Sequence, residues 1–106
     1  MPNWCRAVTF IGEHAHEDIT IADIAAAACV GIRAVQLAFR RHLDTTPLEY
    51  LRRVRLDRAH RELQAADPAR ETVTAVACGW GFTSTSRFTA YYREVYGVVP
   101  SYTLRS

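Results

Sequence analysis

Long apolar runs are missing from this 106-residue sequence. No hydrophobic segment approaches the roughly 18 residues that a membrane-spanning helix needs. The first ten residues, MPNWCRAVTF, also lack the charged and apolar regions of a secretory signal. These absences argue against a transmembrane or exported protein, and they lead us to expect a soluble cytoplasmic protein with no membrane partner.

Cysteine is scarce, and its spacing excludes the usual metal and disulfide frameworks. Cys5, Cys29 and Cys78 are odd in number, and no two of them have the Cys-x-x-Cys spacing. We therefore expect all three to be small buried hydrophobic residues.

One short segment raises a metal hypothesis. His14 and His16 lie between Glu13 and Glu17. Two histidines at i and i+2 point to different sides of a helix, and no cysteine or third histidine lies nearby to complete a zinc site. We interpret the segment as a solvated helix end, and we predict no metal and no other cofactor.

Lysine is absent, so all thirteen basic side chains are arginines. Arginine is the better residue for bidentate contact with phosphate or guanine, although a GC-rich genome produces the same composition. Residues 1–30 hold one arginine against four acidic residues, whereas residues 31–106 hold twelve against seven, a local excess of +5. This excess favours an anionic partner for the second region.

Catalytic motifs are also absent. The hydroxyl and imidazole side chains do not form a recognisable set of nucleophile, base and orienting group. No loop of the phosphate-cradling type is present either. We therefore predict that the chain is not an enzyme.

What the sequence does contain is an uninterrupted helical pattern over residues 46–66, TPLEYLRRVRLDRAHRELQAA. Thr46 is a suitable cap, Pro47 suits the first helical position, and Glu49 follows three residues after the cap. Asp67-Pro68 ends the pattern. About twenty residues at about 1.5 Å each give a rod of about 30 Å, close to the roughly 34 Å of one turn of B-DNA.

A helix-turn-helix pattern precedes this rod. Residues from about 4 to 14 predict an amphipathic helix, and Thr20 with Asp23 can cap a short alanine-rich helix. Gly31 then marks a turn before a helix over residues 32–43. The buried stripe of this last helix consists of Val35, Phe39 and Leu43.

A second pattern of the same kind follows the rod. Residues 72–78 predict a short helix and residues 79–82 a turn. Residues 85–96 predict a longer helix that Ser84 caps and Gly97 terminates. Its buried stripe consists of Phe88, Tyr92 and Tyr96.

The two patterns form an internal repeat. The offset is 53 residues in the longer helices and 52 in the shorter ones, so the second turn is one residue longer. The pairs at offset 53 include Gly31 with Ser84, Val35 with Phe88, Phe39 with Tyr92, Leu43 with Tyr96, Asp44 with Gly97 and Pro47 with Pro100. We predict an all-α fold of about seven helices, with subunits over about residues 4–45 and 70–106 and a linker helix over about residues 46–66.

Two stretches carry a family resemblance, IADIAAAACVGIRAVQLAFRRHLDTTPLEYLRRVRLDRAHREL and VTAVACGWGFTSTSRFTAYYREVYGVVPSYTLR. Together they resemble the DNA-binding domain of the AraC/XylS family of bacterial transcription regulators. The resemblance implies that helices 32–43 and 85–96 are recognition helices for two major-groove segments about one turn apart. The base-reading residues that it implies are Arg33, Gln36, Leu37, Thr85, Ser86, Arg87 and Ala90. The phosphate contacts that we expect are Arg40, Arg41 and Arg93.

The resemblance also implies partners and a location. Double-stranded DNA is the expected partner, RNA polymerase is a candidate second partner, and the expected location is the nucleoid. Family members usually carry a separate ligand-sensing or dimerisation domain, so we expect dimerisation through a domain outside this chain. Three residues depart from the family pattern. Gly31 stands where the family usually has a serine cap, and Cys29 and Asp44 stand where it usually has glycine. We expect the first subunit to be less rigid as a result.

The two expected recognition helices offer different chemistry. Arg33 and Gln36 share one helix face and can pair with guanine and adenine respectively. The second helix offers mainly small side chains near its start, so we expect the first helix to carry more of the direct readout. Two alternatives stay open: a protein-interaction module that retains the fold without reading DNA, and a DNA-binding domain of another helix-turn-helix family.

Overall fold

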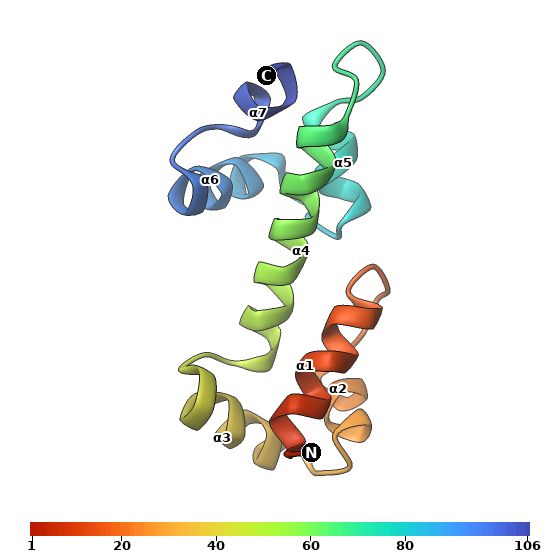
Figure 1. Cartoon of the computed structure of the whole chain (residues 1–106), viewed down its shortest axis with the longest axis vertical. Coiled ribbons are helices and arrows are strands. Elements are labelled where there is room, and N and C mark those ends of the chain that lie inside the picture. Colours follow the sequence, from red (N-terminus) through yellow and green to blue (C-terminus); the bar gives the residue numbers. More distant parts are fainter. The chain divides into compact units, whose positions relative to one another are not determined.

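The computed structural model describes all residues from Met1 to Ser106 and contains seven α-helices and no strands (Figure 1). The helices are α1 (Asn3–His14), α2 (Ile21–Ala27), α3 (Ile32–Leu43), α4 (Pro47–Ala65), α5 (Val73–Gly79), α6 (Thr85–Tyr96) and α7 (Pro100–Arg105). The predicted all-α class with seven helices is therefore confirmed. The chain divides into two compact units, Met1–Val54 and Arg55–Ser106, and the boundary falls within α4.

Helix α4 is continuous from Pro47 to Ala65, as its sequence predicts. The Thr46 Oγ1 accepts a hydrogen bond of 3.1 Å from the backbone N–H of Glu49, which satisfies one free donor of the first turn. The buried side chains of α4 serve two cores. Leu51 belongs to the core of the first unit, and Leu56, Ala59 and Leu63 belong to the core of the second.

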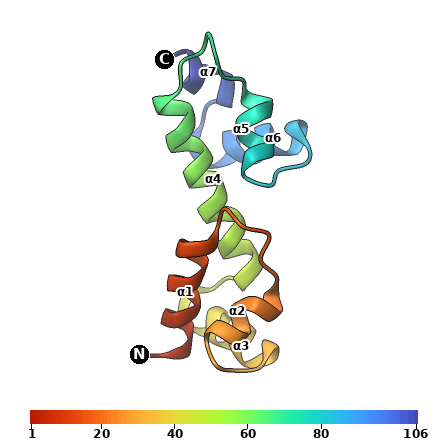
Figure 2. The ribbon, with the colours of Figure 1, turned by 90° about the vertical axis from the view of Figure 1, so that its right-hand side faces the viewer.

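The first unit is built on the mutual packing of α1, α2 and α3 (Figure 2). Helix α2 begins with the predicted capping box, because Thr20 and Asp23 bond reciprocally to each other's backbone N–H. Helices α2 and α3 are bent by 83° relative to each other. The buried core consists of Ala7, Ile11, Ala15, Ile24, Ala25, Ala28, Val35, Phe39 and Leu51.

The second unit is built on the mutual packing of α5, α6 and α7, together with the second half of α4. Thr72 caps α5 through a 3.1 Å hydrogen bond from Ala75 N–H. Helix α5 continues to Gly79, so the predicted turn begins one residue later than expected. The buried core consists of Leu56, Ala59, Leu63, Val76, Ala77, Phe88, Tyr92 and Leu104.

The internal repeat also includes α1, which the alignment of the two halves of the sequence did not cover. At an offset of 52 residues, Ala7 and Ile11 of α1 correspond to Ala59 and Leu63 of α4, and all four side chains are fully buried. The second half of α4 therefore has the role in the second unit that α1 has in the first. Each unit thus has a leading helix, a short helix, a longer exposed helix and a trailing helix.

Left-handed backbone conformations end the same helices in both units. Cys29 (φ 60°) follows α2 and Gly81 (φ 86°) follows α5, whereas Asp44 (φ 52°) follows α3 and Gly97 (φ 78°) follows α6. Only glycine adopts this conformation without a steric cost. The first unit therefore has non-glycine residues at both positions where the second unit has glycine, in agreement with the expected departures at Cys29 and Asp44.

The expectation that the cysteines are buried is wrong, because none of the three lies in the buried core. Cys29 and Cys78 are exposed, Cys5 is half-buried, and all three thiols are free. Cys29 lies outside the end of α2 in the left-handed position, and its side chain is exposed. Cys78 directly follows Val76 and Ala77, the buried pair of α5, and so lies on the outer side of that helix.

No single helix of the chain is both long enough and apolar enough to cross a bilayer. The only pair that meets the length and composition criteria jointly is α2 with α3, which is the bent pair described above.

Candidate nucleic-acid interface

Helix α3 has one fully buried side and one exposed side. Val35 and Phe39 are completely buried, and the Phe39 ring meets the Tyr50 ring edge-on at a centroid distance of 5.7 Å. Gly31 is the N-cap and supplies no side-chain hydrogen bond. The core contacts at Val35 and Phe39 therefore fix which side of α3 faces outward.

The outward side of α3 carries the side chains expected to read bases. Arg33, Gln36 and Leu37 are all exposed, and neither Arg33 nor Gln36 has a hydrogen-bond or ion-pair partner within the chain. Leu37 is 59% exposed, which is unusual for a leucine on a packed helix. Two free polar side chains and one free apolar side chain at i, i+3 and i+4 form a surface suited to the edges of base pairs.

Basic residues follow in the last turn of α3. Arg40 and Arg41 are exposed, and Arg40 Nη1 lies 3.5 Å from Asp44 Oδ1 in a solvated i, i+4 pair. Such an exposed pair contributes little and can open, so Arg40 remains available to a phosphate. His42 stacks on Trp4 of α1 with a centroid distance of 5.2 Å, which packs the end of α3 against α1.

Helix α6 also has one buried side and one exposed side, and the side chains on its exposed side are mostly smaller than those of α3. The Ser84 Oγ accepts a 3.2 Å hydrogen bond from Arg87 N–H and begins the helix, while Phe88 and Tyr92 are completely buried. The side chains expected to contact DNA are exposed in every case: Thr85, Ser86, Arg87, Ala90 and Arg93. The structure therefore brings each expected set of contact residues onto the free side of one helix.

A polar cluster lies behind α6, between that helix and helices α4 and α7, and the sequence analysis did not predict it. Its members are Asp57, His60, Tyr92, Tyr96 and Thr103. The Tyr92 hydroxyl donates to Thr103 Oγ1 at 2.6 Å and lies 2.5 Å from Nδ1 of His60, so the imidazole N–H is the donor to Tyr92. The Tyr96 hydroxyl donates to Asp57, and the His60 and Tyr96 rings stack. Extending the repeat to α1 places His60 opposite the half-buried Val8, which indicates partial burial of His60 but does not identify its partners.

Burial shifts the pKa of one member of this cluster, Tyr92. It raises the pKa of the Tyr92 hydroxyl above its ordinary value of 10.0, because the charged phenolate would lose its hydration. Thr103 lowers the same pKa and offsets part of this effect, because its hydroxyl can turn to donate to the charged phenolate oxygen.

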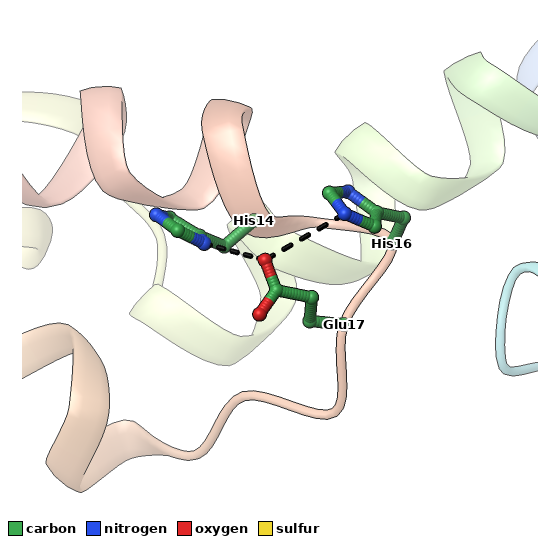
Figure 3. A network of polar contacts seen from close by, with 3 residues as sticks. All are labelled: His14, His16 and Glu17. Carbon is green, nitrogen blue, oxygen red and sulfur yellow. Dashed lines mark hydrogen bonds and ion pairs between the residues drawn. The ribbon is translucent and has the colours of Figure 1, made fainter.

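The histidine pair near the end of α1 forms a cluster of polar contacts with Glu17 (Figure 3). Glu17 Oε2 lies 2.5 Å from His14 Nδ1 and 3.6 Å from His16 Nε2. His14 also packs against the Phe10 ring at a centroid distance of 4.5 Å. No group of three or more His, Cys, Asp or Glu side chains in the chain could hold a metal ion.

Comparison with known proteins places these features in a family. A family model described as a helix-turn-helix domain matches residues 24–106. A probable thc operon regulatory protein of Rhodococcus erythropolis is 39% identical over 94% of this chain, and XylDLEGF operon transcriptional activator 1 of Pseudomonas putida is 34% identical over 98% of it. The chain spans 30% and 31% of the length of these two curated relatives.

Solved structures agree with the sequence comparison. A probable AraC family transcriptional regulator from Rhodopseudomonas palustris matches with a TM-score of 0.90 and 32% identity, over 99% of this chain and 96% of that one. The DNA-binding domain of AdpA, solved in complex with a target DNA, matches with a TM-score of 0.81 and 27% identity over 99% and 92% of the two chains. The chain therefore belongs to the AraC/XylS family of bacterial transcription regulators, as a helix-turn-helix DNA-binding domain and not an enzyme.

Proposed function

We propose that α3 and α6 are two recognition helices, and that each enters a segment of the major groove of double-stranded DNA. The observation that carries this proposal is the outward side of α3. Its long polar side chains, Arg33 and Gln36, have no partner in the chain, while Val35 and Phe39 fix the opposite side in the core. A partner that offers hydrogen-bonding groups to a single helix face accounts for this arrangement, and the major groove is such a partner.

The first unit would read bases directly. Arg33 can donate two hydrogen bonds to O6 and N7 of guanine, and Gln36 can pair with N6 and N7 of adenine. Leu37 can contact the methyl group of thymine. Each bidentate contact discriminates against the wrong base by about 1–3 kcal/mol.

The second unit would read with shorter groups. Thr85, Ser86 and Ala90 can contact a thymine methyl or a bridging water, and Arg87 is the only long cationic side chain near the start of α6. The first helix would therefore carry more of the direct readout. Arg40, Arg41 and Arg93 would bind phosphates, which adds affinity and salt dependence without sequence choice.

The spacing of the two groove segments is part of the same proposal. We propose that the two segments lie about one turn of B-DNA apart, which is about 34 Å, as the family resemblance implies.

Alanine substitution at Arg33 and at Ser86 tests the proposal. Binding of each variant is measured on a matched site and on single-base mismatches, with the salt dependence of the wild type recorded alongside. We expect Arg33→Ala to lose about 1–3 kcal/mol of discrimination at one base pair, and Ser86→Ala to lose less. An equal or larger loss with Ser86→Ala contradicts the unequal readout, and a salt slope near zero favours the protein-interaction module instead.

A further inference from the structure

The polar cluster behind α6 links three helices of the second unit, α4, α6 and α7, through directional contacts. Asp57 and His60 lie one turn apart on α4, and Tyr92 and Tyr96 lie one turn apart on α6. His60 donates to Tyr92, Tyr92 donates to Thr103 of α7, and Tyr96 donates to Asp57. The His60 ring also lies on the Tyr96 ring, with 3.9 Å between centroids and 14° between planes.

The first unit has no such network at the corresponding positions. The offset of 52 places Val8 opposite His60, and the offset of 53 places Phe39 and Leu43 opposite Tyr92 and Tyr96. Tyr50 corresponds to Thr103, so the edge-on contact of Phe39 with Tyr50 replaces the hydrogen bond of Tyr92 with Thr103. Helix α3 is thus held by apolar contacts, and α6 is held by hydrogen bonds in addition.

The way in which each helix is held corresponds to the side chains on its outward face. Arginine and glutamine on α3 can adjust their rotamers to reach a base when the helix shifts slightly. The short side chains of Thr85, Ser86 and Ala90 cannot, because their reach is fixed by the backbone. A helix that reads with short side chains must be held within about 0.5 Å and about 10–20° of its working position.

We propose that His60 and Tyr96 are positioning residues for DNA reading by α6. Their hydrogen bonds fix the rotation of α6 about its own axis and its position along α4. Apolar packing alone constrains both less tightly, because hydrogen bonds are directional and apolar contacts are not. The inference rests on the proposed function, since it concerns how the second recognition helix is held. It assigns a role in base discrimination to side chains that are not among the proposed DNA contacts.

Three variants test the inference in the full chain. His60→Leu fills the space but removes the donor to Tyr92, and Tyr96→Phe removes only the hydroxyl that donates to Asp57. His60→Asn is the rescue variant, because its amide N–H can lie where Nδ1 of His60 lies. Discrimination is measured by base substitution along the site, at a temperature at which circular dichroism shows each variant to be folded.

The expected result is specific to one part of the site. His60→Leu and Tyr96→Phe each lower discrimination at the base pairs read by α6 by about 3- to 10-fold, the effect of one lost hydrogen bond. Discrimination at the base pairs read by α3 changes by less than about twofold, because distant sites act independently. His60→Asn restores discrimination at the α6 segment to within about twofold of the wild type.

Two outcomes overturn the inference. Unchanged discrimination in folded His60→Leu and Tyr96→Phe, with only a lower melting temperature, shows a purely structural role. Equal losses at the α3 and α6 segments show a general effect on the fold. Failure of the proposed function is distinct from both, because it would appear in the wild type as an absence of base preference at the α6 segment. Should His60→Leu not fold, Tyr96→Phe decides between the same outcomes.

Discussion

Cys29 occupies the same left-handed backbone position after α2 that Gly81 occupies after α5, with φ angles of 60° and 86°. Each follows its helix by two residues, and the next residue closes the same loop in both units. Val30 N–H donates to Ala25 O at 3.1 Å, and Phe82 N–H donates to Ala77 O at 3.0 Å. This bonding satisfies carbonyls that the helix end leaves free, so the conformation is required in both units whichever residue is present.

Replacing Cys29 with glycine should therefore stabilise the chain. The substitution removes the steric cost of a side chain at positive φ and adds the entropy cost of a glycine, for a net gain of about 0.5–1 kcal/mol. Asp44→Gly at the end of α3 should gain less, because aspartate adopts the left-handed region more readily than most residues. Urea unfolding monitored by circular dichroism measures both, and a loss of stability in Cys29→Gly would contradict this reading of the turn.

Gly81→Ala should destabilise the chain by about 1–2 kcal/mol, because alanine at positive φ is strained. The added Cβ itself has room, since its nearest neighbour would be Arg55 Nη1 at 3.6 Å, an ordinary contact. Gly79→Ala is the matched control, since its Cβ meets nothing within 4 Å and its φ is not positive. We expect the control to leave unfolding free energy unchanged or to raise it by up to about 1 kcal/mol, because alanine favours helix. Equal destabilisation by both substitutions would refute the assigned cause.

The raised pKa of Tyr92 predicts a loss of stability in alkaline solution. The unfolded chain ionises this tyrosine near pH 10.0, whereas the folded chain keeps the proton to a higher pH because burial opposes the charge. Between these two values the unfolded state binds fewer protons, so the free energy of unfolding falls as the pH rises. The contribution is fully present below pH 10.0 and is lost as the pH passes through the folded-state pKa.

Tyr92→Phe isolates this contribution. At pH 7 the variant should be less stable than the wild type by about 1–3 kcal/mol. The reason is that the imidazole N–H of His60 loses its acceptor. Its stability should then decline less steeply than that of the wild type above pH 10.0. Urea titrations at a series of pH values give the comparison, and parallel declines in the two proteins would show that Tyr92 is not the group responsible.

Leu37 offers a test of base reading that does not depend on a charged side chain. If it contacts a thymine methyl, replacing that thymine with uracil removes one methyl group and costs about 0.8 kcal/mol of affinity, or about fourfold. Leu37→Ala should bind more weakly and lose most of this difference between thymine and uracil. Because Leu37 is 59% exposed, the substitution should leave thermal stability nearly unchanged. An undiminished thymine preference in the variant would exclude Leu37 as the reader.

The sequence predicts helix ends well where a cap and a stop are both local signals. Helix α6 begins and ends as expected because Ser84 bonds to Arg87 N–H and Gly97 takes the left-handed conformation. The outward faces of α3 and α6 were also predictable, since buried side chains at i and i+4 determine which side remains exposed.

Features that depend on tertiary contacts were not predictable in the same way. His60 and Asp57 lie on a charged helix, where polar residues usually indicate a solvated face, and only the packing of α6 and α7 gives them partners. The exposure of Cys29 depends on one backbone angle outside its helix. Hydrophobicity alone favoured burial of that side chain, and the local geometry overrode it.

Selection of bound sequences from a random duplex pool, followed by footprinting on the selected site, tests the central claim most directly. Two recognition helices predict enriched bases in two major-groove segments about 10 base pairs apart, with stronger enrichment in the segment that Arg33→Ala weakens. Enrichment confined to a single segment, or no enrichment above the starting pool, would contradict the claim that both α3 and α6 read DNA.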